Sequence, residues 1–117
     1  LGQYNEKVNF STAQVTHGSI KTTAYVFDSI AYISDCNDLS IVSMKIFQNL
    51  KYLVIDCLKI KKSLVHFNLD EALYVHSRLK PKKTILTNLN SDLDYDFLLK
   101  RLPKNVLPAY DGLKLNL

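Results

Sequence analysis

The 117-residue sequence predicts a mixed α/β (α+β) fold built on a single sheet. Three observations carry this prediction. Two β-prone runs near the start are joined by a short polar turn, and later apolar runs each end abruptly on a polar residue. Segments with helical spacing alternate with those later runs, so helices are expected to form a layer on the sheet. Residues 1–117 show no internal repeat or second domain and are expected to form one unit.

Composition narrows the class of protein. Hydrophobic residues make up 47% of the chain, which indicates a packed core and excludes a disordered tail. No apolar run reaches the roughly 18 residues of a membrane-spanning helix, and no signal-peptide pattern is present. Cys36 and Cys57 are therefore expected to be reduced thiols in a cytoplasmic protein. The first residue is Leu1 rather than Met, so we expect the protein to begin further upstream.

The net charge of +4 favours anionic partners, including phosphate-bearing substrates. The lysines are scattered, which is more typical of a solvated surface than of a nucleic-acid patch.

The first third of the chain predicts adjacent strands. Residues 8–15 suggest one or two short strands, and glycine after His17 permits a tight turn. Residues 20–27 and 30–34 are β-prone and are joined by a two-residue turn at 28–29. We expect them to form an antiparallel hairpin.

The next segment predicts a helix and then a buried strand. Ser40 is a plausible N-cap for a helix whose apolar residues recur at helical spacing, namely Val42, Ile46, Phe47 and Leu50. Residues 52–57 form a continuous apolar run that contains Asp56 near its end, as in a strand buried on both faces. Residues 59–65 are a basic, irregular linker.

A second helix is indicated more strongly. Asn68 and Glu71 have the spacing of a capping box, and Pro81 is expected to end the helix. Its predicted buried face is Leu69, Ala72, Leu73, His76 and Leu79.

The last third predicts strand, helix and strand. Residues 84–87 are a short buried strand, followed by a polar loop. Asp92 or Asp94 is expected to cap a helix carrying Tyr95, Leu98, Leu99 and Leu102. Prolines at 103 and 108 mark turns before a final strand over residues 113–117.

Three segments place a titratable side chain at the end of a strand or in a loop. His17 follows a strand, Asp35 ends one, and His66 precedes a helix. If these segments converge on one rim of the sheet, imidazole and carboxylate suit a zinc, manganese or iron site of the two-metal hydrolase type. Taken singly, each residue is more often structural. Asp56 could orient such a site or only end its strand, and His76 has the position of a packing histidine.

Seven segments together resemble the metallo-β-lactamase superfamily. More narrowly, they resemble the branch that contains the phosphoribosyl cyclic phosphate phosphodiesterase of phosphonate degradation. The resemblance covers the chain from about Val15 onward. The segments are Val15-Thr-His17-Gly-Ser-Ile20, Ala31-Tyr-Ile-Ser-Asp35, Leu53-Val-Ile-Asp56, His66-Phe-Asn-Leu-Asp-Glu-Ala-Leu73, Ile85-Leu-Thr87, Asp92-Leu-Asp-Tyr95 and Pro108-Ala-Tyr-Asp-Gly112.

The resemblance implies the carboxy-terminal half of an αββα sandwich, with a mixed sheet and helices on its outer face. It implies two divalent ions, manganese, zinc or iron, in the complete enzyme, with His17 as a ligand and Asp35 bridging both ions. His66 would contact the substrate phosphate or donate a proton to the leaving group. The implied reaction is hydrolysis of a cyclic or small phosphodiester by a water that the metals activate.

The chain departs from the family at two points. The family's His-x-His-x-Asp-His motif is absent from this sequence. The family's last histidine ligand also has no counterpart, and Asn88 and Asn90 stand in that segment as weaker candidate ligands. We therefore expect an amino-terminal half carrying the motif, or a second copy of the chain, to cover an exposed apolar sheet face.

These departures shape the expected function. The chain is expected to act as a metal-dependent phosphodiesterase only with that other half, and to be inactive and poor at binding metal alone. The alternative is a non-catalytic remnant or interaction module that keeps the fold. A nucleic-acid-binding module is a third and weaker hypothesis, which would require steeply salt-dependent binding.

Overall fold

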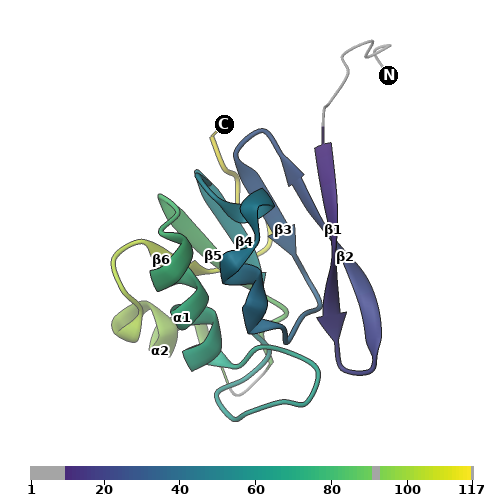
Figure 1. Cartoon of the computed structure of the whole chain (residues 1–117). Helices are drawn as coiled ribbons and strands as arrows, with labels where there is room; N and C mark the ends of the chain where they lie inside the picture. The colour runs from purple at the N-terminus through teal and green to yellow at the C-terminus, as the bar shows by residue number, and fades with distance from the viewer. Residues whose placement is uncertain (1–9, 91–92, 117) are drawn as a thin grey trace, which may run out of the picture.

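The computed structural model describes residues 10–90 and 93–116 and is organised around one six-stranded sheet. The strands lie in the sheet in chain order, from β1 at one edge to β6 at the other (Figure 1). Their bounds are β1 Phe10–His17, β2 Ile20–Phe27, β3 Ile30–Ile33, β4 Tyr52–Asp56, β5 Lys83–Thr87 and β6 Val106–Pro108. No helix in these described ranges has the length and apolarity needed to cross a membrane.

The first three strands form an antiparallel meander. β1 pairs with β2 over its whole length, from Phe10 opposite Phe27 to His17 opposite Ile20. β2 pairs with β3 through a two-residue turn in which Asp28 has a φ of 52°, a conformation that aspartate tolerates. This confirms the predicted hairpin.

The remaining strands are parallel and are joined by crossovers. β3, β4, β5 and β6 pair in parallel, so their carboxyl ends meet at one edge of the sheet. β1 runs in the same direction as β3, because each is antiparallel to β2. The end of β1 at His17 therefore lies at that same edge.

Two α-helices connect the parallel strands. α1 (Leu69–Leu79) begins at the predicted capping box, with Asn68 accepting from the Glu71 N–H and Glu71 accepting from the Asn68 N–H. Lys80 caps the end of the helix in a left-handed conformation with a φ of 50°, and its N–H donates to the His76 carbonyl. α2 (Tyr95–Arg101) is capped by Asp94, while Asp92 lies outside the described residues.

The helix predicted from Ser40 is wrong. The segment forms two short 3-10 helices, η1 (Leu39–Ser43) and η2 (Lys45–Phe47), separated by Met44 in an extended conformation. Asp38 caps η1 by accepting from the Ser40 N–H. The physical reason is burial: Ile41 and Phe47 are both fully buried, yet six residues apart they would lie on different sides of a helix with about 3.6 residues per turn.

The last strand also differs from the prediction. The strand is β6, and residues 113–116 have no regular secondary structure; Leu117 lies outside the described residues. Pro108 can belong to β6 because an edge strand leaves one row of backbone groups without a ladder partner. Leu113 and Leu115 instead pack on the sheet beside Tyr52.

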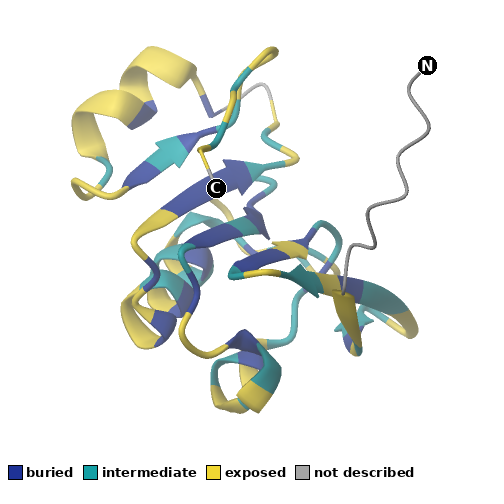
Figure 2. Cartoon of the chain, turned by 90° about the horizontal axis from the view of Figure 1, so that it is seen from above, coloured by how far each residue is buried: buried dark blue, intermediate teal, exposed yellow. Residues whose placement is uncertain are grey.

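The two faces of the sheet are covered differently. The main core lies between the sheet and α1, η1 and η2, and includes Leu98 of α2 at the β6 side. Buried residues gather on the central strands in Figure 2, whereas the outer side of α2 is exposed. A smaller cluster around Ile30, Tyr52 and Ile85 lies on the opposite face under the carboxy-terminal segment.

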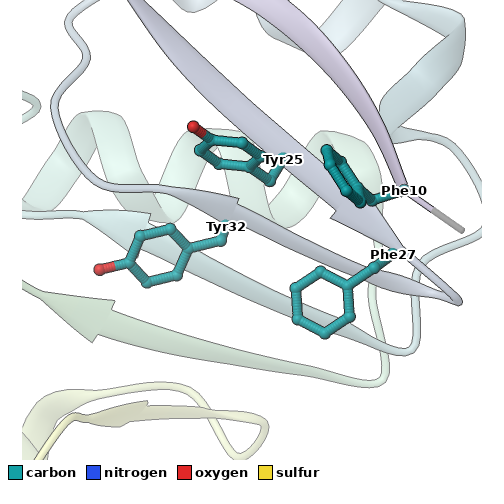
Figure 3. A pocket seen from close by; sticks show the side chains of 4 residues that line it. All are labelled: Phe10, Tyr25, Phe27 and Tyr32. Carbon is teal, nitrogen blue, oxygen red and sulfur yellow. The ribbon is translucent and has the colours of Figure 1, made fainter. Parts of the chain in front are cut away.

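Beyond that cluster, the same opposite face carries four aromatic side chains on β1, β2 and β3. They are Phe10, Tyr25, Phe27 and Tyr32, and they surround a hollow of about 380 Å³ (Figure 3). We call these four residues the aromatic face. Phe10 is 61% exposed, and Tyr25 and Tyr32 are each 42% exposed.

Candidate metal centre

The candidate site lies at the edge of the sheet where β1, β3, β4 and β5 end. His17 is the last residue of β1, and Asp35 follows β3 by two residues. Asp56 ends β4, and the loop after β4 returns His66 to the same edge. The topology therefore brings together residues from four separate segments.

His17, Asp35 and His66 form one group that could hold a metal ion. One ligand atom from each residue lies within 4.8 Å of the others. The two imidazole rings meet edge to face with their centroids 4.7 Å apart, and His66 Nδ1 lies 3.9 Å from Asp35 Oδ1. The three side chains are partly accessible, so an ion could reach them from solvent.

Both histidines are held through their Nδ1 atoms. His17 Nδ1 lies 2.7 Å from the Val65 carbonyl oxygen, and His66 Nδ1 lies 2.6 Å from Asp56 Oδ2. A carbonyl oxygen can only accept, so His17 Nδ1 is the donor, and a carboxylate on Asp56 gives His66 the same tautomer. Each neutral ring then has its lone pair on Nε2, the arrangement that metal-ligating histidines commonly show.

Asp56 has the orienting role that the sequence left open. It is fully buried, and burial raises the pKa of its carboxyl group. Hydrogen bonds from the Cys36 N–H at 3.0 Å, from His66 and from Asn88 act in the opposite direction. The carboxylate oxygens of Asp56 accept from these donors, so Asp56 orients the His66 ring and is not itself a member of the group formed by His17, Asp35 and His66.

Asn37 is a positioning residue that the sequence did not reveal. Its Oδ1 accepts from the Gly18 N–H at 3.1 Å, and its Nδ2 donates to the Leu64 carbonyl at 2.7 Å. Its own N–H donates to the Thr16 carbonyl at 3.0 Å. Asn37 thus ties the hairpin tip that carries His17 to the loop that carries His66. All of its partners are backbone groups of distant segments, which leave no sequence signal.

Asn88 reaches the site with its nitrogen. Asn88 Nδ2 donates to the Ser34 carbonyl, and it lies 3.4 Å from Asp35 Oδ1 and 3.3 Å from Asp56 Oδ1. Because all three partners are acceptors, the amide oxygen faces away from them. Asn90 is exposed, and its N–H donates to the Leu58 carbonyl at 2.7 Å. A ligand role for either asparagine stays a prediction.

Three other candidate ligands do not join the group. Cys36 and Cys57 are buried and unpaired, and burial raises the pKa of each thiol to about 12, so both remain protonated near neutral pH. His76 lies on α1, where its Nδ1 is 2.7 Å from Thr84 Oγ1. It packs between α1 and β5.

Three solved structures match the chain closely in fold. A diphosphatase from the PhnP family is 32% identical with a TM-score of 0.89, over 94% of this chain and 44% of that chain. The metallo-β-lactamase fold protein YhfI from Bacillus subtilis is 18% identical with a TM-score of 0.73, over 89% of this chain and 47% of that one. Human tRNase Z, short form, is 14% identical with a TM-score of 0.63, over 93% of this chain and 43% of that one.

This chain therefore spans less than half the length of each of these three proteins. Comparisons with protein-family models and with curated proteins found no match.

Proposed function

Because the chain has the metallo-β-lactamase fold, over less than half the length of its structural neighbours, we propose that it is one part of a metal-dependent hydrolase. The observation that carries this proposal is the group of His17, Asp35 and His66 at the carboxyl ends of the strands. The imidazole of His17 and the carboxylate of Asp35 are ligands suited to zinc, manganese or iron, and the His66 imidazole lies beside them.

A small or cyclic phosphodiester is the substrate class we propose. The family resemblance supports it, and so does the basic loop before His66, which carries Lys59, Lys61 and Lys62. Lys61 and Lys62 are exposed and free to turn toward an anion. The similarity to a diphosphatase favours a diphosphate as the second candidate, since both classes present a phosphorus centre with anionic oxygens.

Each residue of the site has a defined task in this proposal. Divalent ions, when bound, supply positive charge for the phosphoryl oxygens and activate a water. His17 and Asp35 hold metal, and the Val65 carbonyl fixes the His17 ring. Water adds to phosphorus and the bond from phosphorus to the leaving oxygen breaks, while His66 Nε2 takes up the proton that the water releases and gives it to that oxygen. Asp56 keeps the His66 ring in the orientation this transfer needs.

A second polypeptide is part of the proposal. More than half of the matched diphosphatase has no counterpart here, because this chain covers 44% of it. The aromatic face is the apolar surface on which such a polypeptide can pack. We propose that the partner carries the His-x-His-x-Asp-His motif, with a second copy of this chain as the alternative occupant.

The test is a reconstitution. The coding sequence immediately upstream is read for the motif, and the polypeptide it encodes is mixed with this chain and manganese. Hydrolysis of a generic phosphodiester and of a diphosphate is then followed. We expect turnover only from the mixture, lost in Asp35→Asn and retained in Asp28→Asn, an exposed turn residue.

A metal-loaded complex that hydrolyses neither compound would favour the non-catalytic module. Turnover by the isolated chain would show that no partner is needed.

A further inference from the structure

We propose that β1 pairs with β1 of a second copy of this chain, so that two sheets join edge to edge in an antiparallel dimer. β1 is an edge strand of eight residues, with β2 on one side and no strand of the described part of the chain on the other (Figure 1). This edge is a different surface from the aromatic face. The dimer needs neither metal nor substrate, so the proposal goes beyond the function above.

Half of the backbone groups of β1 point away from the sheet. His17 and Ile20 flank a two-residue turn and form a hydrogen-bonded pair, so the odd-numbered residues of β1 bond to β2. The even-numbered residues point outward, and Thr16 fits this alternation because its carbonyl accepts from the Asn37 N–H at 3.0 Å. Three residues have outward N–H and C=O groups to which no described residue bonds, namely Phe10, Thr12 and Gln14.

β1 lacks the features that keep the edge strands of separate molecules apart. It contains no proline and no lysine, arginine, aspartate or glutamate, and its register with β2 is continuous, without a bulge. β6 at the opposite edge has only three residues and ends in Pro108. Because one edge is open and the other is blunted, pairing through β1 gives a closed dimer rather than a fibre.

A second copy fits this edge because β1 is complementary to itself. With a twofold axis at Thr12, the outward groups of Thr12 meet those of the same residue in the other copy. Phe10 of each copy then lies opposite Gln14 of the other. This register uses all three free residues and leaves the Thr16 carbonyl to Asn37. The strands bring no like charges together, and the two threonines at the axis are a favourable cross-strand pair.

The dimer leaves the other surfaces of the chain open. His17 is five residues from Thr12, about 17 Å along the strand at 3.4 Å per residue, so the two candidate metal centres lie at opposite ends of the paired strands. The twofold axis is perpendicular to the sheet, which places both aromatic faces on the same side. Self-pairing through β1 is therefore compatible with binding of the amino-terminal polypeptide.

The first experiment measures the mass of the native chain alone by sedimentation equilibrium at micromolar concentrations. We expect a dimer, with twice the 13.4 kDa mass of the chain. Thr12→Pro should be monomeric, because it removes an outward N–H and leaves the bonds between β1 and β2 intact. Tyr32→Lys, on the aromatic face, should remain dimeric, and circular dichroism checks that each variant folds.

A native chain that stays monomeric would overturn the proposal, and so would a folded Thr12→Pro variant that stays dimeric. A dimer lost in Tyr32→Lys and kept in Thr12→Pro would place the interface on the aromatic face instead. None of these outcomes depends on hydrolysis by a reconstituted complex, so the proposed function is tested separately.

The second experiment tests the position of the axis and does not introduce proline. Thr12→Lys and Thr12→Glu should each raise the dissociation constant of the dimer at least about fivefold, because like charges meet at the axis. An equimolar mixture of the two variants should associate again, since the facing charges are then opposite. If each variant is monomeric alone and the mixture stays monomeric too, the two copies do not meet at Thr12 and the proposed register is wrong.

Discussion

At the tip of the first hairpin, Gly18 has a φ of +63° and a space that only glycine fits. A Cβ atom there would lie 2.5 Å from Val65 Cγ1, so alanine would meet both a strained backbone and a clash. Gly112 offers a matched comparison, since its φ is +86° and nothing lies within 4 Å of an added Cβ.

We expect Gly18→Ala to lower the free energy of unfolding by about 2–3 kcal/mol and Gly112→Ala by about 1 kcal/mol. Urea unfolding measures both. Adding Val65→Ala should recover most of the difference, because it removes the atom that the new Cβ meets. Equal costs for the two glycine variants would show that the hairpin tip and the Val65 loop are not packed as described.

His76 gives the fold an acid sensitivity that lies away from the candidate site. Burial lowers the pKa of His76 in the folded chain, whereas in the unfolded chain it is about 6.5. Protonation therefore favours the unfolded state. The stabilisation that the neutral His76 ring gives the folded state is fully present at pH values above the pKa of the unfolded chain. It is lost as the pH falls from that pKa toward the lower pKa of the folded chain.

We expect unfolding experiments at pH 7.5 and 5.5 to show a loss of stability on acidification that is smaller in His76→Gln. Glutamine can keep a hydrogen bond to Thr84 without titrating. The comparison isolates His76 from the other groups that titrate in this range. An unchanged pH dependence in the variant would place the acid sensitivity elsewhere.

Among the helices and strands, the correct predictions are those that rest on sequence signals within a few neighbouring residues. The hairpin, β4, β5 and α1 were predicted because strand pairs, apolar runs and a capping box act within a few residues. The segment after Asp38 failed because burial of Ile41 and Phe47 by distant elements overrides helical spacing. β6 failed because only the sheet order shows that Pro108 lies at an edge.

The candidate site likewise has residues that could be predicted from the sequence and contacts that could not. His17, Asp35 and His66 could be proposed because each stands where a strand or loop ends, and the family resemblance connected them. The hydrogen bond from His66 to Asp56 and the contacts of Asn37 depend on where distant segments meet. No pattern within one segment specifies such contacts.

The capping box of α1 lends itself to a direct test. Asn68→Ala leaves the Glu71 N–H without its acceptor, so we expect a loss of about 1 kcal/mol, with Asn68→Ser close to native. Asp94→Ala removes the cap of the shorter, largely exposed α2 and should cost less. Thermal unfolding compares the three variants. A larger loss in Asp94→Ala would mean that α2 contributes more to the core than its burial indicates.

For the whole molecule, we propose that the aromatic face is the surface through which the chain associates with a partner. Tyr25 and Tyr32 face each other across β2 and β3 and are each 42% exposed. Tyr74 on α1 is equally exposed but lies on the other side of the sheet, which makes it a control.

We expect Tyr25→Lys and Tyr32→Lys to weaken complex formation with the amino-terminal polypeptide, because each buries a charge in an apolar contact. Tyr74→Lys should leave it unchanged. Sedimentation velocity of the mixtures measures complex formation. The same measurement on the chain alone reports self-association. A loss of association in Tyr74→Lys and not in the other two would move the contact surface to the helical side.

We expect the metal content of the proposed complete assembly to depend on Asn88. Its amide nitrogen now faces the carboxylates of Asp35 and Asp56, in the segment where the family resemblance expects a histidine. Asn88→His removes these hydrogen bonds and supplies an imidazole, and histidine tolerates the φ of 62° at this position better than most residues do.

We therefore expect the reconstituted complex to bind more manganese or zinc with Asn88→His than with the native chain, as measured by elemental analysis. Asn88→Ala separates the two effects, because it frees the carboxylates without adding a ligand. Asn90→His tests the neighbouring position of the same exposed loop. If Asn88→Ala gains as much metal as Asn88→His, release of Asp35 is sufficient and the imidazole does not reach the site. If neither gains, the ligands of the complete assembly are already saturated without this segment.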